Sequence, residues 1–227
     1  MRSSWDDPKG VLFGLKGGQQ DWDHLHHDLN GFVLYAYGKP LIAELWYPMT
    51  VWGCETEAHN TIMVAGKEQY GKVGIMGQGS APDSRHRGLV GDAVDTPWYT
   101  RLVGDASLAY EPGDVRSFLR EVMYLRHGAP TDPPDYFVLF DDVDATGPLW
   151  MDWMLHTYGS ITISGRTFTV AQDNAAVDVM MVSPEEYVVD DHEKSLEEIK
   201  APEPFASART FTYVKLRPAQ PAGREHF

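Results

Sequence analysis

Histidines and carboxylates gather in one short segment of the sequence, DHLHHDLN at residues 23–30. In an extended chain alternate side chains point the same way, so His24, His26 and Asp28 would share one face and His27 would point to the other. Neutral imidazoles and carboxylates are ordinary ligands of zinc, and one strand rarely surrounds an ion. The segment therefore predicts part of a metal site that needs further ligands from elsewhere. Surface histidines beside a capping Asp28 are the alternative interpretation.

Two later residues are candidates to complete such a site. Glu44 follows the apolar run Leu41-Ile42-Ala43, and His59 lies in ETEAHNT at residues 55–61, just before the apolar run Ile62-Met63-Val64. A lone histidine in such a place is more often structural than a ligand. Its pairing with the first histidine cluster favours the ligand interpretation.

The elements that must position these residues are predicted to be strands. The 227 residues are 43% hydrophobic and include 21 glycines and 15 prolines, which fits many short strands joined by marked turns. We expect one all-β domain, an antiparallel sandwich over residues 1–227. Apolar or alternating runs predict its strands at 11–15, 31–37, 41–46, 61–65, 115–124, 136–140, 149–156, 161–163, 167–170, 176–182 and 210–216.

Other segments predict connections. Gly38-Lys39-Pro40 predicts a hairpin turn, and Asp141, Asp142 and Asp144 predict a turn rather than a calcium loop, because the twelve-residue calcium pattern is missing. The acidic stretch 183–200 is typical of a helix or a solvated linker. Residues 218–227 are predicted to be a loop-like tail.

Charge and composition exclude several classes of function. A net charge of −14 argues against a nucleic-acid partner, which needs a basic face. The single cysteine, Cys54, rules out an internal disulfide framework. No apolar stretch is long enough to span a membrane, and the N-terminal residues lack the apolar core of a signal peptide. Nucleophile-elbow, phosphate-loop and H-E-x-x-H motifs are missing.

Two motifs resemble a known family. The pattern HxHxDxNxFVLYAYGKPLxAxxxY at residues 24–47, followed by ETxAHNTxxVxGK at 55–67, resembles the β-sandwich domain of heparinase II/III-like polysaccharide lyases. The resemblance covers about residues 1–170 and implies a supersandwich-like fold. It also implies a zinc site built from His26, Glu44 and His59, although the family usually has aspartate at the position of Glu44.

The resemblance further implies a reaction and its partners. These lyases cleave uronic-acid polysaccharides, such as glycosaminoglycans or alginate, by β-elimination, and His24 is the histidine expected to face the substrate. Tyr47 lies in an aromatic loop against which a sugar ring could rest. The family's other catalytic groups lie on an N-terminal helical toroid that is absent from these residues, so we expect a toroid upstream or in a partner chain, and a periplasmic or secreted location.

Two alternatives stay open. A non-catalytic carbohydrate-binding or scaffolding module would explain the sandwich without the toroid. A cupin-type metalloenzyme would explain Gly18, His24, His26 and Gly38, but no second cupin motif follows.

Overall fold

The computed structural model describes residues 1–19, 26–45, 52–69, 87–126, 135–195 and 210–227. In these ranges the chain forms strands β1 to β16 and two short 3₁₀ helices, η1 (Trp52–Cys54) and η2 (Thr56–Ala58). Every strand pair is antiparallel. The predicted all-β antiparallel sandwich is confirmed. No described helix is long and apolar enough to cross a membrane.

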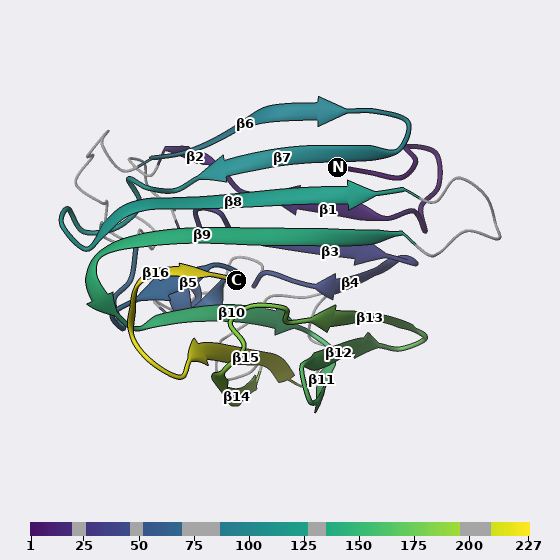
Figure 1. The fold of residues 1–227 in the computed structure, drawn as a ribbon. Helices are drawn as coiled ribbons and strands as arrows, with labels where there is room; N and C mark the ends of the chain where they lie inside the picture. The colour runs from purple at the N-terminus through teal and green to yellow at the C-terminus, as the bar shows by residue number, and fades with distance from the viewer. Residues whose placement is uncertain (20–25, 46–51, 70–86, 127–134, 196–209) are drawn as a thin grey trace, which may run out of the picture.

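The largest sheet has the order β16-β9-β8-β7-β6-β2 and forms one layer of the molecule (Figure 1). Its long central strands pair over many residues, and their side chains alternate between the core and the outer face. The strands of this sheet are β2 (Gly18–Gln19), β6 (Arg87–Asp95), β7 (Tyr99–Asp105), β8 (Val115–Leu125), β9 (Tyr136–Leu149) and β16 (Ala222–His226).

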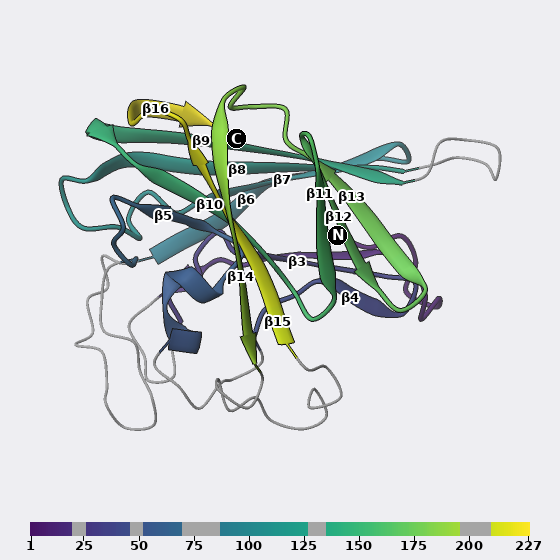
Figure 2. The ribbon, with the colours of Figure 1, turned by 90° about the horizontal axis from the view of Figure 1, so that it is seen from below.

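Three smaller sheets complete the sandwich, as Figure 2 shows from a second direction. The first has the order β1-β3-β4, with β1 (Leu12–Leu15), β3 (Phe32–Ala36) and β4 (Lys39–Ile42). The second has the order β14-β15-β10-β5, with β5 (Ile62–Val64), β10 (Met151–Thr157), β14 (Tyr187–Ser195) and β15 (Thr210–Pro218). The third has the order β11-β12-β13, with β11 (Ser160–Ser164), β12 (Thr167–Gln172) and β13 (Ala175–Met180).

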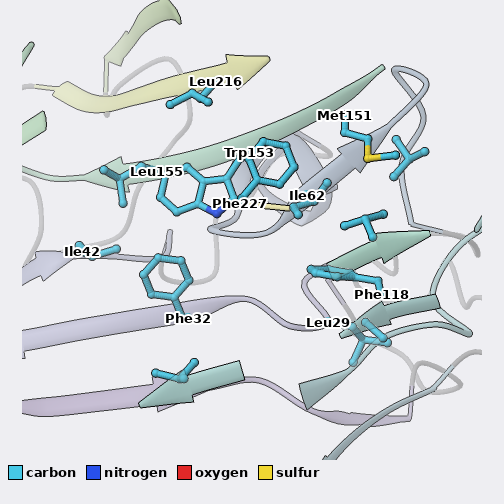
Figure 3. Packing of buried hydrophobic residues seen from close by; sticks show 14 of the residues in the cluster. Leu29, Phe32, Ile42, Ile62, Phe118, Met151, Trp153, Leu155, Leu216 and Phe227 are labelled. Atoms are coloured by element: carbon cyan, nitrogen blue, oxygen red, sulfur yellow. The ribbon is translucent and has the colours of Figure 1, made fainter. Parts of the chain in front are cut away.

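One hydrophobic core lies between these sheets (Figure 3). Phe32 of β3 lies near the indole of Trp153 of β10, with their ring centroids 6.2 Å apart. Phe118 of β8 and Leu29 are fully buried in the same core. Every residue of β10 is buried, so both faces of this central strand are covered. The core thus joins the large sheet to the segments around the histidine cluster.

The predicted hairpin is present, with its turn one residue earlier. Tyr37 and Gly38 both have positive φ, 56° and 77°, as a two-residue type I′ turn requires. Pro40 already lies in β4, opposite Tyr35. The return of the chain along β4 carries Glu44 back toward the start of β3.

Three local predictions are wrong. Asp141, Asp142 and Asp144, expected to form a turn, lie within β9. The acidic stretch 183–200, expected to be a helix or linker, contains β14, which pairs with β15 along its whole length. Its charged residues suit an edge strand, whose outer side faces water, while Tyr187 and Val189 pack on the core. The expected loop-like tail contains β16, and Phe227 is buried and exchanges backbone hydrogen bonds with Asp141.

Candidate metal centre

Three metal-binding side chains converge beside the start of β3. His26 and Asp28 lie in the segment before this strand, and His59 lies between η2 and β5. Each of the three offers one ligand atom, and these atoms all lie within 4.8 Å of one another. The rings of His26 and His59 have centroids 5.1 Å apart. Two imidazoles and a carboxylate at this spacing can hold a metal ion.

Backbone contacts fix the loop that carries His26 and Asp28. The N–H of His27 donates to the carbonyl of Cys54 at 2.9 Å, and the N–H of Gly31 donates to the carbonyl of Asp28 at 2.8 Å. A Cβ on Gly31 would lie 2.7 Å from that carbonyl oxygen, so the close approach requires glycine. Asn30, also in this turn, has a φ of 58°. The loop is therefore a tight turn rather than extended chain.

Glu44 contacts His59 directly. One carboxylate oxygen meets Nδ1 of His59, and the other accepts the backbone N–H of Asn60 at 2.9 Å. The opposite ring nitrogen, Nε2 of His59, is buried and has no hydrogen-bond partner among the described residues. A carboxylate on one imidazole nitrogen orients the ring and raises the basicity of the other nitrogen toward a metal. A buried imidazole nitrogen without a hydrogen-bond partner fits the role of a metal ligand.

The pKa values of His26 and His59 are shifted in opposite directions. Burial, together with the nearby positive charge of His59, lowers the pKa of His26 to about 4, so His26 is neutral near pH 7 and able to bind a metal. Burial also lowers the pKa of His59, but the charge and hydrogen bond of Glu44 outweigh burial and raise that pKa above its usual value. Protonation of His59 competes with binding of a metal ion to its ring, so metal affinity should fall at acidic pH.

A small cavity borders the cluster. Its volume is about 240 Å³, and both Asp28 and Glu44 line it, together with Lys16 and the apolar side chains of Leu15 and Phe32. The ammonium of Lys16 lies 3.5 Å from the carboxylate of Asp28. The positively charged side chain of Lys16 thus lines the same cavity as the carboxylates of Asp28 and Glu44.

The structure brings together the three residues that the sequence predicted as ligands: His26, Glu44 and His59 lie in one cluster. It also places Asp28 in the cluster, although the segment forms a turn and not the extended chain from which the shared face of His26 and Asp28 was predicted. His24 and Tyr47, the predicted catalytic and substrate-binding residues, lie outside the described residues.

Trp52, five residues after Tyr47, is partly buried against Tyr213, and its indole N–H donates to Glu57.

A further histidine supports the cluster from β10. His156 is fully buried, its backbone N–H donates to the side-chain oxygen of Asn60 at 2.7 Å, and its Nε2 lies 2.9 Å from the carbonyl of Glu57. Its ring stacks on Tyr213. Sequence reasoning treated His156 only as part of a strand, because nothing local shows that it contacts residues nearly a hundred positions earlier.

His156 should make the fold sensitive to acid. Burial lowers its pKa to about 3, whereas a histidine in the unfolded chain titrates near 6.5. Below pH 6.5 His156 binds a proton in the unfolded chain but not in the folded chain. The free energy of unfolding therefore falls as the pH drops from 6.5 toward 3. At pH 5 this histidine accounts for about 2 kcal/mol of the loss.

Urea unfolding at pH 7, 6 and 5, in the presence of a chelator, measures this effect. We expect His156→Gln to be less stable at pH 7 but to lose less stability on acidification than the wild type. His226→Ala, at a half-exposed histidine on β16, is the control for loss of a histidine outside the core. A His156→Gln variant with an unchanged slope would show that His156 is not the responsible group.

The fold is similar to part of two solved polysaccharide lyase structures. The chain matches a heparinase III, the BT4657 gene product, over 100% of its length with a TM-score of 0.70 and 14% identity. It matches a heparan sulfate lyase HepC mutant from Pedobacter heparinus over 100% of its length with a TM-score of 0.68 and 13% identity. In both cases it spans 33% of the other chain. No family model and no curated protein matches the sequence.

Proposed function

We propose that this chain is the metal-binding β-sandwich of a polysaccharide lyase that cleaves uronic-acid polysaccharides by β-elimination together with a helical catalytic domain. The observation that carries the proposal is the convergence of His26, Glu44 and His59 in a fold that aligns along its whole length with two heparin-type lyases. These three residues belong to the two motifs that resemble the family.

Zinc is the ion that fits the donor set best. The cluster offers two imidazoles and carboxylate oxygens, a combination that zinc accepts in a tetrahedral site. His26 is neutral near pH 7 because burial lowers its pKa, and Nε2 of His59 is a buried nitrogen with no described partner. When bound, zinc would fix the loop before β3 against the loop before β5 and add positive charge beside the substrate. Either Asp28 or Glu44 can supply the oxygen ligand. If Asp28 is the ligand, Glu44 orients the ring of His59.

The proposed chemistry explains why charged and proton-carrying groups must gather here. Removal of the weakly acidic C5 proton of a uronate requires that the sugar carboxylate be neutralised, and a base and an acid must move protons from C5 and to the leaving O4. We assign His24, two residues before His26, to substrate neutralisation or proton transfer. Tyr47, three residues after Glu44, is assigned to contact with a sugar ring.

The remaining catalytic groups belong to a helical toroid in this proposal. The chain spans a third of the length of the lyases it matches, which leaves room for such a partner domain upstream or in a second chain. An acidic polysaccharide is the proposed substrate, in a periplasmic or secreted setting.

Metal binding by variants tests the site. Wild-type protein should bind one zinc ion, and an excess of free zinc at 100 times Kd should stabilise it by about 2.7 kcal/mol. We expect His26→Ala and His59→Ala to abolish this stabilisation, because each removes a nitrogen ligand. Elemental analysis and thermal unfolding with and without zinc measure both effects.

A matched pair of isosteric substitutions assigns the carboxylate. Loss of a residue that only orients a ligand typically weakens metal binding by about 10–100-fold, and loss of the oxygen ligand itself should weaken it more. The larger loss among Asp28→Asn and Glu44→Gln therefore identifies the ligand. His226→Ala is the control for a histidine outside the cluster. Equal zinc binding by wild type, His26→Ala and His59→Ala would disprove the site.

A further inference from the structure

A fully buried ion pair lies behind the cluster, in the large sheet. Arg120 of β8 and Asp141 of β9 face each other across the two strands and are both 0% exposed. Nε and one terminal nitrogen of the guanidinium donate to the two carboxylate oxygens of Asp141, each at 2.6 Å. The indole N–H of Trp153 also donates to this carboxylate at 3.1 Å. The acid is thereby held from two sides.

The third guanidinium nitrogen contacts both loops of the candidate metal centre. Nη1 of Arg120 donates to the carbonyl of Asn30 at 2.5 Å and to the carbonyl of Asn60 at 2.8 Å. Asn30 is two residues after Asp28, and Asn60 directly follows His59. One nitrogen atom thus connects the segment that carries His26 and Asp28 with the segment that carries His59.

Other buried contacts make this connection rigid. The side-chain amide of Asn60 donates to the carbonyls of Phe32 and Ala43 at 2.9 and 2.8 Å. The hydroxyl of Thr61 donates to the carbonyl of Leu29 at 2.8 Å. The guanidinium of Arg120 also lies over the ring of Phe32, 5.1 Å from its centroid. The two loops are therefore bonded to each other and, through Arg120, to the large sheet.

We propose that Arg120, held by Asp141, is the positioning residue that sets the distance between the two histidine-bearing loops and so determines the affinity of the metal centre. This inference rests on the proposed metal-binding function. Metal ligands must be held within about 0.5 Å of their working geometry, which requires support from the surrounding residues. The rigid fork of arginine can bind a carboxylate and two carbonyls at once, and lysine cannot reproduce that geometry.

The test removes the ion pair without leaving a buried charge. In Arg120→Met/Asp141→Leu both charges are replaced by apolar side chains of similar size, a change that folded proteins often tolerate. The matched control is Arg217→Met/Asp152→Leu, which removes another bidentate pair, at 2.6 and 2.7 Å. Among the described residues the side chain of Arg217 contacts Asp152 and Trp150, and neither metal-centre loop takes part in these contacts.

Zinc affinity is measured by competition with a chelator, and cobalt is used as a second probe whose visible absorption reports coordination geometry. We expect the Arg120 double variant to bind zinc at least about tenfold more weakly than the wild type, in the range seen when outer partners of metal ligands are lost, and to show an altered cobalt spectrum. Arg120→Lys should also bind zinc more weakly than the wild type, because lysine keeps the positive charge but lacks the planar set of guanidinium donors. The control double variant should match the wild type. A folded Arg120 double variant with wild-type affinity and spectrum overturns the proposal.

Amide hydrogen exchange of metal-free protein separates this proposal from the proposed function. We expect the amides of Leu29, Asn30, Gly31, Asn60 and Thr61 to exchange faster in the Arg120 double variant, relative to the global stability of each protein, and not in the control. If the wild type binds no metal yet these amides lose protection, the metal-binding function fails while the positioning role stands. If the protection of these amides is unchanged, the positioning role is wrong, whether or not the protein binds a metal ion.

Discussion

The 227-residue chain alone should form little or no unsaturated product from a uronate polymer, and addition of the helical toroid should raise product formation by at least about a thousandfold. β-Elimination needs a base, an acid and a neutralised carboxylate in one place, and catalytic groups that act as a unit fail together when one is missing. The measurement is the ultraviolet absorbance of the unsaturated uronate, with heparan-like and alginate-like polymers as substrates and the toroid fused upstream or added as a separate chain.

Two variants make this experiment specific. In the reconstituted protein His24→Ala should lower activity, because His24 is assigned to the substrate, while His226→Ala should leave activity unchanged. Strong activity of the isolated chain would show that the sandwich suffices, and the division of labour proposed for the two domains would be wrong. Saccharide binding without product, even with the toroid, would favour the non-catalytic binding module.

The largest loss of stability is expected for Arg120→Ala. Removal of one partner from a buried ion pair leaves an uncompensated charge and typically costs about 3–5 kcal/mol. Here Asp141 would be left fully buried with the indole of Trp153 as its remaining described side-chain donor. Urea unfolding at pH 7, with far-ultraviolet circular dichroism as the signal, measures the change in free energy.

The same sheet provides a matched control at its surface. Arg101 and Glu121 form an equally well aligned bidentate pair, at 2.6 and 2.7 Å, but about a third of each side chain is exposed. Ion pairs exposed to water are worth about 0–1 kcal/mol, so Arg101→Ala should cost far less than Arg120→Ala. Similar losses for the two variants would contradict the argument from burial.

The strands that sequence reasoning located are those with apolar or alternating runs. Segments such as 32–36 and 151–157 carry enough apolar side chains to show on their own that they lie in a core. Strands β6 and β7 escaped prediction because most residues of β6 are exposed, and glycine and aspartate interrupt both strands. Strand β14 was misjudged because its many charges are typical of solvated chain, whereas an edge strand also keeps one side in water.

The candidate site was predicted in part for a clear physical reason. The density of histidines and carboxylates at 23–30 indicates a metal site from local sequence alone, whereas the choice of His26 and His59 as ligands came from the resemblance to a lyase family. The contact between Glu44 and the Nδ1 of His59 required the β3–β4 hairpin to return the chain to its starting point.

Long-range pairing explains what sequence reasoning missed. Arg120 lies ninety residues from Asn30, so nothing in the local sequence predicts their contact. Asp141 has a turn-like local sequence, but its partner Arg120 lies on the neighbouring strand. Asp142 and Asp144, in the same predicted turn, likewise lie in β9 and bind Arg224 and Arg116.

The most direct test of the account is a crystal structure of the zinc-soaked protein with an anomalous difference map collected at the zinc absorption edge. The account predicts one strong peak bonded to a nitrogen of His26 and a nitrogen of His59, at about 2.0–2.1 Å from each, with an oxygen of Asp28 or Glu44 at about 2.0–2.2 Å. A map with no peak at this cluster, or with its zinc bound by other residues, would contradict the claim that this β-sandwich carries a metal centre.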